Sequence, residues 1–251
     1  MFEYGLITAA AFFAGILNAI AGGGSFLTFP ALVYIGIPPV PANATSAVAV
    51  FPGYFSSTIG YIEEIKAFDR KQLWQLILMA CAGGIAGAML LLITPGALFR
   101  GLAPWLLLLA TLLFAAGDKI SLWMERQRNG GGNAEARSHP LAVLLVSTYG
   151  GYFNGGLGII LLALFSAMGF RDLNLMNGLK NGLSFLLSAV SVLTFAIAGV
   201  VHWPQALVMM LFATIGGFVG ARIARKLPRA WVKRFIVTVG ALMTIAFFVF
   251  Q

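Results

Sequence analysis

The sequence predicts an all-α polytopic membrane protein made of two inverted-topology repeats of four apolar segments each, with the first segment of each repeat broken or re-entrant. Three observations lead to this fold class. Of the 251 residues, 60% are hydrophobic and only 10% are charged, against about 25% charged in an ordinary soluble domain. Apolar runs of about 20 residues recur along the chain, each long enough to cross a hydrocarbon core of about 30 Å. The second half also repeats the pattern of the first.

The internal repeat divides the chain into three parts. A shift of 133 residues aligns the two halves over most of their length, and the shift becomes 136 near the start of each half. We therefore expect a first membrane repeat over 1–120, a cytoplasmic linker loop over 121–140 and a second membrane repeat over 141–251. The linker is polar, charged and Gly-rich, which is typical of a flexible loop. The matched pairs include Asn18 with Asn154, Gly22 with Gly158, Gly87 with Gly220 and Pro95 with Pro228.

Eight apolar segments follow one another in order. The first repeat holds 4–36, 42–61, 73–93 and 98–117, and the second holds 141–169, 173–201, 204–223 and 231–250. The first segment lacks a basic region before it and a small-residue cleavage site after it, so we expect it to stay in the chain rather than act as a signal peptide.

The basic residues indicate how the chain threads the membrane. If every segment crosses once, the 15 Lys and Arg residues outside segment interiors divide 8 to 7 between the two sides. If the first segment of each repeat enters and leaves by the same side, 14 of them fall together and only Arg100 lies opposite. Because cytoplasmic loops carry an excess of Lys and Arg, we expect the second threading, with both termini in the periplasm. These loops also account for the net charge of +8, and no nucleic acid partner is expected.

Three consecutive glycines interrupt the first segment within AGGGS at 21–25. Glycine inside a helix costs roughly 1 kcal/mol relative to alanine, and a break in lipid is tolerated only where the backbone is buried in protein or lines a water-filled cavity. Interrupted helices near the bilayer midplane are the usual construction of secondary-transporter sites. A different set of glycines follows small-xxx-small spacing and predicts close helix packing: Gly83, Gly84, Gly87, Gly216, Gly217 and Gly220.

The stretch GILNAIAGGGSFLTFPALVYIGIPPVPANATS resembles the sulfite exporter TauE/SafE family of bacterial membrane permeases. The second half fits as well, in FNGGLGIILLALFSAMGF, NGLKNGLSFLLS and GGFVGARIARKLP. The resemblance covers nearly the whole chain and implies an inner-membrane permease that moves small sulfur-containing anions, mostly as an exporter. The two half-sites differ, because Gly-Leu-Lys at 178–180 stands where the first half has Ala-Thr-Ser at 44–46.

In the first half, the candidate substrate-binding residues surround the glycine run. Backbone N–H groups and the positive end of a helix dipole can hold an anion at an interrupted helix. The glycines allow close approach, and the side chains of Ser25 and Asn18 can donate to an oxyanion. Thr45 and Ser46 are predicted near the start of the next helix, where they either cap it or direct donors to the same cavity. The candidates are Asn18, Gly22, Gly23, Gly24, Ser25, Thr45 and Ser46.

In the second half, the candidates lie in the matching break and in the following segment. Lys180 is the only charged residue well inside an apolar segment. Intramembrane charge is a functional hypothesis by default, although Lys180 lies close enough to the segment start to snorkel to the cytoplasmic surface instead. Asn177 can share its helix face, whereas Asn181 points elsewhere. The candidates are Asn154, Gly156, Gly158, Asn177, Lys180 and Asn181.

The expected activity is transport of a substrate that undergoes no chemical reaction. No Asp or Glu falls inside a segment, and no enzyme signature, cofactor motif or metal-ligand spacing is present. The family resemblance implies a small sulfur anion such as sulfite or a sulfonate as the substrate, and we expect it to leave the cell by alternating access, driven by the membrane potential or the substrate gradient. The expected partners are this anion and the bilayer, and a homodimer is left open. Three alternatives remain: uptake of a sulfur anion, a channel, and a non-transporting membrane scaffold.

Overall fold

The computed structural model describes residues 2–21, 24–129, 139–223 and 229–249, and every regular element within these ranges is an α-helix. The bounds are α1 Phe2–Ala21, α2 Ser25–Tyr34, α3 Pro39–Ile59, α4 Ile62–Ala67, α5 Arg70–Ile93, α6 Gly96–Asn129, α7 Pro140–Tyr152, α8 Leu157–Ala167, α9 Leu173–Ile197, α10 Trp203–Ile223 and α11 Arg229–Val249. Within the described residues, α5, α6, α9 and α10 each contain a stretch long and apolar enough to cross a membrane.

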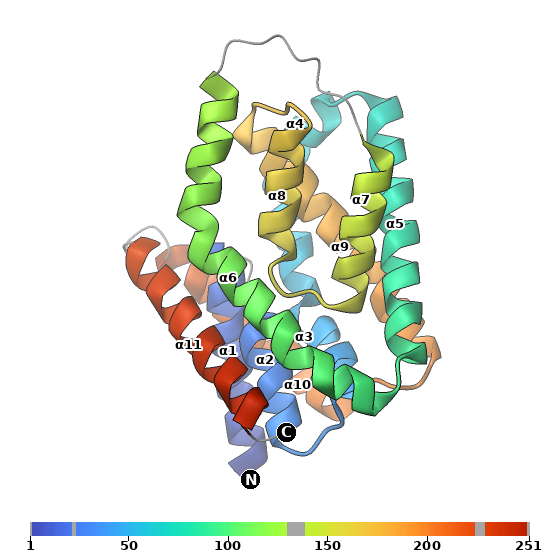
Figure 1. Cartoon of the computed structure of the whole chain (residues 1–251), viewed down its shortest axis with the longest axis vertical. Helices are drawn as coiled ribbons and strands as arrows, with labels where there is room; N and C mark the ends of the chain where they lie inside the picture. The colour runs from blue at the N-terminus through green and yellow to red at the C-terminus, as the bar shows by residue number, and fades with distance from the viewer. Residues whose placement is uncertain (1, 22–23, 130–138, 224–228, 250–251) are drawn as a thin grey trace.

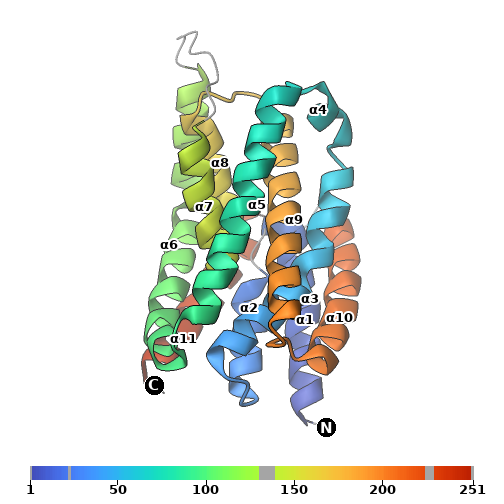
Figure 2. The ribbon, with the colours of Figure 1, turned by 90° about the vertical axis from the view of Figure 1, so that its right-hand side faces the viewer.

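The first segment of each half is broken into two helices, as the sequence predicts. Helix α1 ends at Ala21 and α2 begins at Ser25 in the first half, and α7 ends at Tyr152 and α8 begins at Leu157 in the second. In Figure 1, α1 and α2 lie side by side in the lower part of the molecule, whereas α7 and α8 lie in the upper part, and Figure 2 shows the same separation. Each pair therefore turns back at its break, near the middle of the molecule. The inverted relation of the two halves stays a prediction.

The two halves pack reciprocally. Helix α1 packs mainly against α10, and α7 packs mainly against α5, which is the partner of α10 in the internal repeat. Glycines allow these approaches: a Cβ on Gly87 would collide with the carbonyl oxygen of Thr148, and one on Gly216 would collide with that of Phe12. The packing role predicted for these small residues is confirmed. Gly217 has more room, since its nearest atom would lie 3.8 Å away.

The helix starts follow local sequence signals. The Asp69 side chain accepts a 2.8 Å hydrogen bond from the backbone N–H of Gln72 at the start of α5, and Asp172 accepts one of 2.8 Å from Asn174 at the start of α9. Helix α3 starts at Pro39 with Pro38 as its N-cap, because proline in a first turn lacks an N–H that would have no partner anyway. Thr45 and Ser46 therefore lie inside α3, and their predicted capping role is wrong.

Helix α6 is longer than the predicted segment. It continues from Gly96 through the first part of the linker to Asn129. The residues SLWMERQRN at 121–129 contain several good helix formers and neither Gly nor Pro, so helix persists until the glycines at 130–132. The interpretation of 121–129 as a flexible loop is wrong, and the rest of the linker, 130–138, lies outside the described residues.

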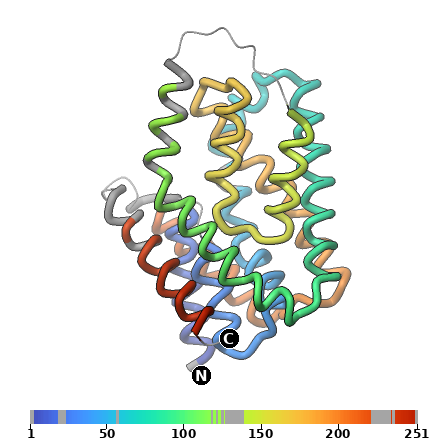
Figure 3. Tube along the Cα trace, in the orientation of Figure 1, coloured from blue at the N-terminus to red at the C-terminus, as the bar shows by residue number. Residues whose placement is uncertain are grey.

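The first and the last described residues lie at the same end of the molecule. Figures 1 and 3 show α1 starting and α11 finishing at the bottom, while α4, the start of α5 and the end of α6 lie at the top. Basic residues belong to the top elements or the turns beside them: Lys66, Arg70, Lys71, Lys119, Arg126 and Arg171. Arg100, in the second turn of α6, belongs to the opposite end. Helix α11, whose first two turns hold Arg229, Lys233 and Arg234, starts near mid-height in Figure 1 rather than at the top. The re-entrant threading therefore stays a prediction.

Aromatic rings pack the second break, at Phe153, against α2 of the first half. The ring of Phe29 in α2 meets Phe153 edge to face at 5.9 Å between centroids, and it stacks on Phe247 of α11 at 5.5 Å. Phe29 and Phe153 are both fully buried. Because such pairs contribute about 0.5–1.5 kcal/mol beyond their area burial, the cluster holds the two breaks in a defined relation.

Candidate functional site

A small buried cavity lies where the two helix breaks meet. About 10 Å³ of it is open to the centre of a water molecule, which is room for roughly one water. It is lined by Ser25 at the start of α2, by Asn43 and Ala47 of α3, by Gly150 and Gly151 in the last turn of α7, by Asn154 of the second break, and by Ser188, Ser191 and Phe195 of α9. None of these lining residues carries a charge.

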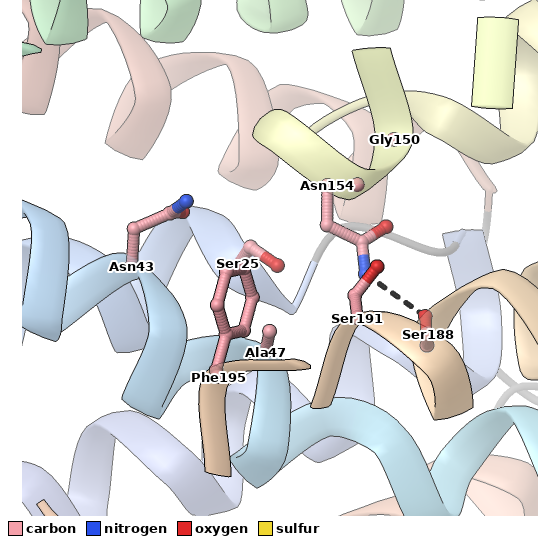
Figure 4. Close-up of a pocket in the computed structure, with 9 residues that line it drawn as sticks. Ser25, Asn43, Ala47, Gly150, Asn154, Ser188, Ser191 and Phe195 are labelled. Carbon is pink, nitrogen blue, oxygen red and sulfur yellow. Dashed lines mark hydrogen bonds between the residues drawn. The ribbon is translucent and has the colours of Figure 1, made fainter. Parts of the chain in front are cut away.

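Ser25 reaches the cavity because α2 begins there. It is the first residue of α2 and only 6% exposed. Figure 4 shows its hydroxyl directed across the cavity toward Asn154 and Ser191. Its oxygen takes part in no hydrogen bond within the part of the chain that the structure describes. Because Ser25 lines the cavity, this hydroxyl is available to a ligand there.

Asn154 stands opposite, in the loop between α7 and α8. Its Oδ1 accepts a 3.1 Å hydrogen bond from the Tyr54 hydroxyl of α3, and its Nδ2 donates to Ser188 Oγ at 3.5 Å (Figure 4). Tyr54 thus occupies the acceptor end of this amide and turns its donor end toward α9. The asparagine, 7% exposed, is held from both sides.

The acceptors of the second break are covered by donors from the surrounding helices. The Tyr149 hydroxyl donates to the Gly155 carbonyl oxygen at 2.6 Å, and Asn43 Nδ2 donates to the Tyr152 carbonyl oxygen at 2.8 Å. With Oδ1 of Asn154 bound by Tyr54, three oxygens of residues 152–155 have a donor from a neighbouring side chain. The remaining hydrogen-bonding capacity that faces the cavity therefore includes several donors, which suits an anionic ligand.

One face of α9 supplies a polar stripe. Ser184, Ser188, Ser191 and Phe195 follow one another at intervals of four, three and four residues, so they share a face, and all are at least 97% buried. Ser191 Oγ donates to carbonyl oxygens of Leu187 at 2.7 Å and Gly84 at 3.1 Å. Its proton is therefore used within the protein, whereas Ser188 Oγ accepts from Asn154 and keeps its own proton for a ligand.

Lys180 extends this stripe toward the start of α9 but does not line the cavity. It lies eight residues before Ser188, about 12 Å along the helix axis. Its Nζ donates to Oδ1 of Asn177 at 3.1 Å, so the ammonium group turns toward the N-terminal end of α9 and away from the cavity. A Cβ on Gly158 would lie 3.5 Å from Cδ of Lys180, which places the lysine stem against the first turn of α8.

The other polar candidates of the first half lie outside the cavity lining. Asn18 faces α3, since a Cβ on Gly53 would lie 2.7 Å from its Nδ2. Thr45 Oγ1 accepts a 3.0 Å hydrogen bond from the backbone N–H of His202 in the turn before α10. Ser46 Oγ and Thr28 Oγ1 are 2.6 Å apart and tie α3 to α2. These three side chains support the elements around the cavity.

The glycine candidates shape the backbone of the breaks. Gly24 precedes α2 and is buried. Gly156 precedes α8 with φ +74°, a left-handed conformation that favours glycine. Gly158 lies against Lys180, and Asn181 is half-buried on α9. Gly22 and Gly23 lie outside the described residues.

Several residues of the site escape a search for charged or glycine-rich motifs. Asn43, Ser188 and Ser191 line the cavity, and Tyr54 and Tyr149 hold the second break. A stripe of serines at positions 184, 188 and 191 inside an apolar segment is visible in the sequence and is the signal that would have found two of them. No group of three His, Cys, Asp or Glu residues within the described ranges could hold a metal ion.

Comparison with known proteins identifies the family. The family model for the sulfite exporter TauE/SafE matches residues 7–247. The chain belongs to the sulfite exporter TauE/SafE family. It is 30% identical over 250 residues to the probable membrane transporter protein YfcA of Escherichia coli K12, covering 96% of this chain and 87% of YfcA. It is 26% identical over 250 residues to a probable membrane transporter protein of Haemophilus influenzae, with 95% and 92% covered.

A third relative agrees with these. The probable membrane transporter protein ORF9 of a Sinorhizobium species is 30% identical over 242 residues, covering 94% of this chain and 88% of the relative. No solved structure matches the chain. Together with the apolar helices, membership in the TauE/SafE family makes this chain a multi-pass membrane protein of a transporter family. The cavity between its two helix breaks is the candidate site of that transport.

Proposed function

We propose that this chain exports a small sulfur-containing anion, sulfite or an organosulfonate, from the bacterial cytoplasm across the inner membrane. The family supports the substrate class. The observation that carries the proposal is the pairing of acceptors at the second break, where Tyr54, Asn43 and Tyr149 cover three oxygens of residues 152–155. The hydrogen-bond donors of Ser25, Ser188 and the Asn154 amide face the cavity and remain available to a ligand. A cavity arranged in this way favours an oxyanion over a cation.

Export needs no proton-coupling carboxylate in this arrangement. None of the residues lining the cavity is Asp or Glu. Moving one negative charge out of a cell with a negative interior is favourable by about 2.3 kcal/mol per 100 mV. The membrane potential or the substrate gradient therefore drives the anion outward, and the basic end of the molecule, with α4 and the starts of α5 and α9, faces the cytoplasm.

Alternating access follows from hydrogen bonds that join the two halves. The Tyr54–Asn154 and Asn43–Tyr152 bonds each link α3 of the first half to the second break. In the present conformation both are made and the cavity is closed around the volume of about one water. We propose that these contacts break when the cavity opens to either side of the membrane.

Anion efflux from proteoliposomes tests the proposal. Vesicles loaded with sulfite, methanesulfonate, sulfate or thiosulfate are compared with protein-free vesicles, with the membrane potential set by a potassium gradient and valinomycin. We expect saturable efflux of sulfite or methanesulfonate that accelerates when the vesicle interior is negative. Efflux that ignores the potential and follows a pH gradient contradicts the proposed mechanism, and the lack of any anion flux contradicts the proposed function.

A further inference from the structure

We infer that the cavity binds its ligand as a monoanion and rejects dianions of similar size. This inference rests on the proposed anion export and specifies the charge of the substrate. It follows from which groups face the cavity and from how far the nearest cation lies.

The donors that face the cavity are all neutral. They are the hydroxyl groups of Ser25 and Ser188 and the amide group of Asn154, since the amide of Asn43 donates to the Tyr152 carbonyl oxygen. Ser191 adds none, because its proton is shared between the carbonyl oxygens of Gly84 and Leu187. The walls between them are apolar, formed by Ala47, Phe195 and two glycines. A few neutral donors in such walls replace part of the hydration of one negative charge.

Among the residues that the structure describes, none that lines the cavity carries a full positive charge to balance a second negative charge. Lys180 is the cation that shares the α9 face with Ser188, and about 12 Å of helix separates them. Its ammonium is bound to Oδ1 of Asn177, on the side away from the cavity. Among the described residues, the titratable side chains next to the second break are phenols: Tyr54 donates to Asn154, Tyr149 donates to Gly155 and Tyr152 bonds to Thr94. His202 lies beyond Thr45, and its side chain is exposed.

Desolvation disfavours the binding of a dianion much more than the binding of a monoanion. The Born cost of transferring an ion from water to a medium of low dielectric constant grows with the square of the charge, so a dianion pays about four times as much as a monoanion of the same radius. The stabilisation from neutral dipoles grows only in proportion to the charge. Neutral donors that offset the desolvation cost of a monoanion therefore cannot offset the much larger desolvation cost of a dianion.

Sulfite makes this inference testable, because it changes from monoanion to dianion near neutral pH, whereas methanesulfonate stays a monoanion and sulfate a dianion. Efflux of all three is measured with the wild-type chain in proteoliposomes, at matched internal and external pH from 6 to 8.5. The KM is expressed as total anion. Because the charge of methanesulfonate is fixed over this pH range, a change in its KM shows that a group of the protein titrates.

We expect the KM for total sulfite to rise with pH, approaching about tenfold per unit well above the pKa of the monoanion. The KM for methanesulfonate should stay within about twofold and sulfate should not be transported, since the charge on each is fixed over this range. If methanesulfonate is transported while the KM for total sulfite is constant or falls with pH, the monoanion inference is wrong and the proposed export still stands. Parallel shifts in both KM values would assign the pH effect to the protein and also overturn the inference. If neither sulfite nor methanesulfonate moves, both the inference and the proposed function fail.

Discussion

The hydroxyl of Tyr54 donates a 3.1 Å hydrogen bond to Oδ1 of Asn154, across 100 positions of sequence and between the two halves of the chain. Both side chains are at least 91% buried. The bond does more than join α3 to the second break, because it decides which end of the asparagine amide faces the cavity. With the carbonyl end held by Tyr54, the N–H₂ end is presented to Ser188 and to a ligand.

Replacing Tyr54 by Phe tests this orienting role. Tyr54→Phe keeps the ring and removes the donor, so the buried oxygen of Asn154 loses its partner at a cost of about 1–3 kcal/mol in the free energy of unfolding. The freed amide can also turn its oxygen toward the cavity. We expect the KM for methanesulfonate efflux to rise about tenfold, the effect of about 1.4 kcal/mol on binding, with a smaller change in kcat.

The matched control for this change is Tyr152→Phe. The Tyr152 hydroxyl makes a 3.4 Å hydrogen bond to Thr94 at the end of α5 and does not face the cavity. Efflux by this variant should keep the wild-type KM. If Tyr54→Phe lowers thermal stability but leaves the KM at the wild-type value, Tyr54 is a structural residue only.

Ser188 is expected to contribute a donor to the anion. Ser188→Ala removes one hydroxyl from the cavity and leaves the helix packing nearly unchanged. A hydrogen bond to a charged group is worth about 1.5–3 kcal/mol, so the KM for methanesulfonate should rise at least tenfold. Ser184→Ala is the control on the same buried face one turn earlier, outside the cavity lining. Equal KM values for the two variants would contradict a specific role of Ser188.

The broken first segments could be predicted from the sequence, but most of the cavity could not. Three adjacent glycines and the distribution of basic residues both indicate that the segment turns back, and these are local or compositional signals. The contact of Tyr54 with Asn154 depends instead on how α3 crosses the tip of the second break, which no local pattern encodes. Asn43 is similar, because its partner is a backbone carbonyl group at Tyr152.

Lys180 illustrates a different limit of prediction. Its position near the start of a helix allowed either a role in anion attraction or snorkelling to the surface. The direction of its side chain depends on Asn177, three residues earlier, and on the space left beside Gly158. The end of α6 differs from the prediction for a simpler reason. The polar residues at 121–129 indicate a loop, but their helix propensity is high and they continue the helix.

Close helix packing at Gly15 is expected to be essential for folding. A Cβ at this position in α1 would collide with the carbonyl oxygen of Ala213 in α10 and lie 2.7 Å from the backbone nitrogen of Gly217. Both neighbours are backbone atoms, so Gly15→Ala forces the helices apart at a cost of about 1–3 kcal/mol or more. Thermal unfolding of the detergent-purified protein measures the loss.

Gly5 in the same helix provides the control, because no atom would lie within 4 Å of its added Cβ. Gly5→Ala should leave the stability unchanged or raise it by up to about 1 kcal/mol through better helix propensity. Equal melting temperatures for the two variants would show that α1 and α10 do not make the close contact in the membrane.

Opposite sides of the membrane are expected for the start of α1 and the start of α7. Glu3 and His139 are both exposed, and single cysteines are placed there in a Cys81→Ala background, which removes the one native cysteine. In spheroplasts, a membrane-impermeant maleimide should label Glu3→Cys at once and His139→Cys only after the membrane is permeabilised. Labelling of both from the same side would contradict the re-entrant threading.

Lys180 is expected to attract the anion to the cytoplasmic mouth rather than to bind it in the cavity. Lys180→Met removes the charge and keeps a long side chain against Gly158. Because salt screens the attraction of an anion that approaches through water, with a screening length of about 8 Å at 0.15 M salt and 3 Å at 1 M, the loss of kcat/KM should be large at low ionic strength and small at high ionic strength. Lys71→Met, at the exposed start of α5, controls for surface charge at the same end of the molecule. A loss that does not depend on salt would assign Lys180 to the binding site itself, and the absence of any loss would leave it as a snorkelling anchor.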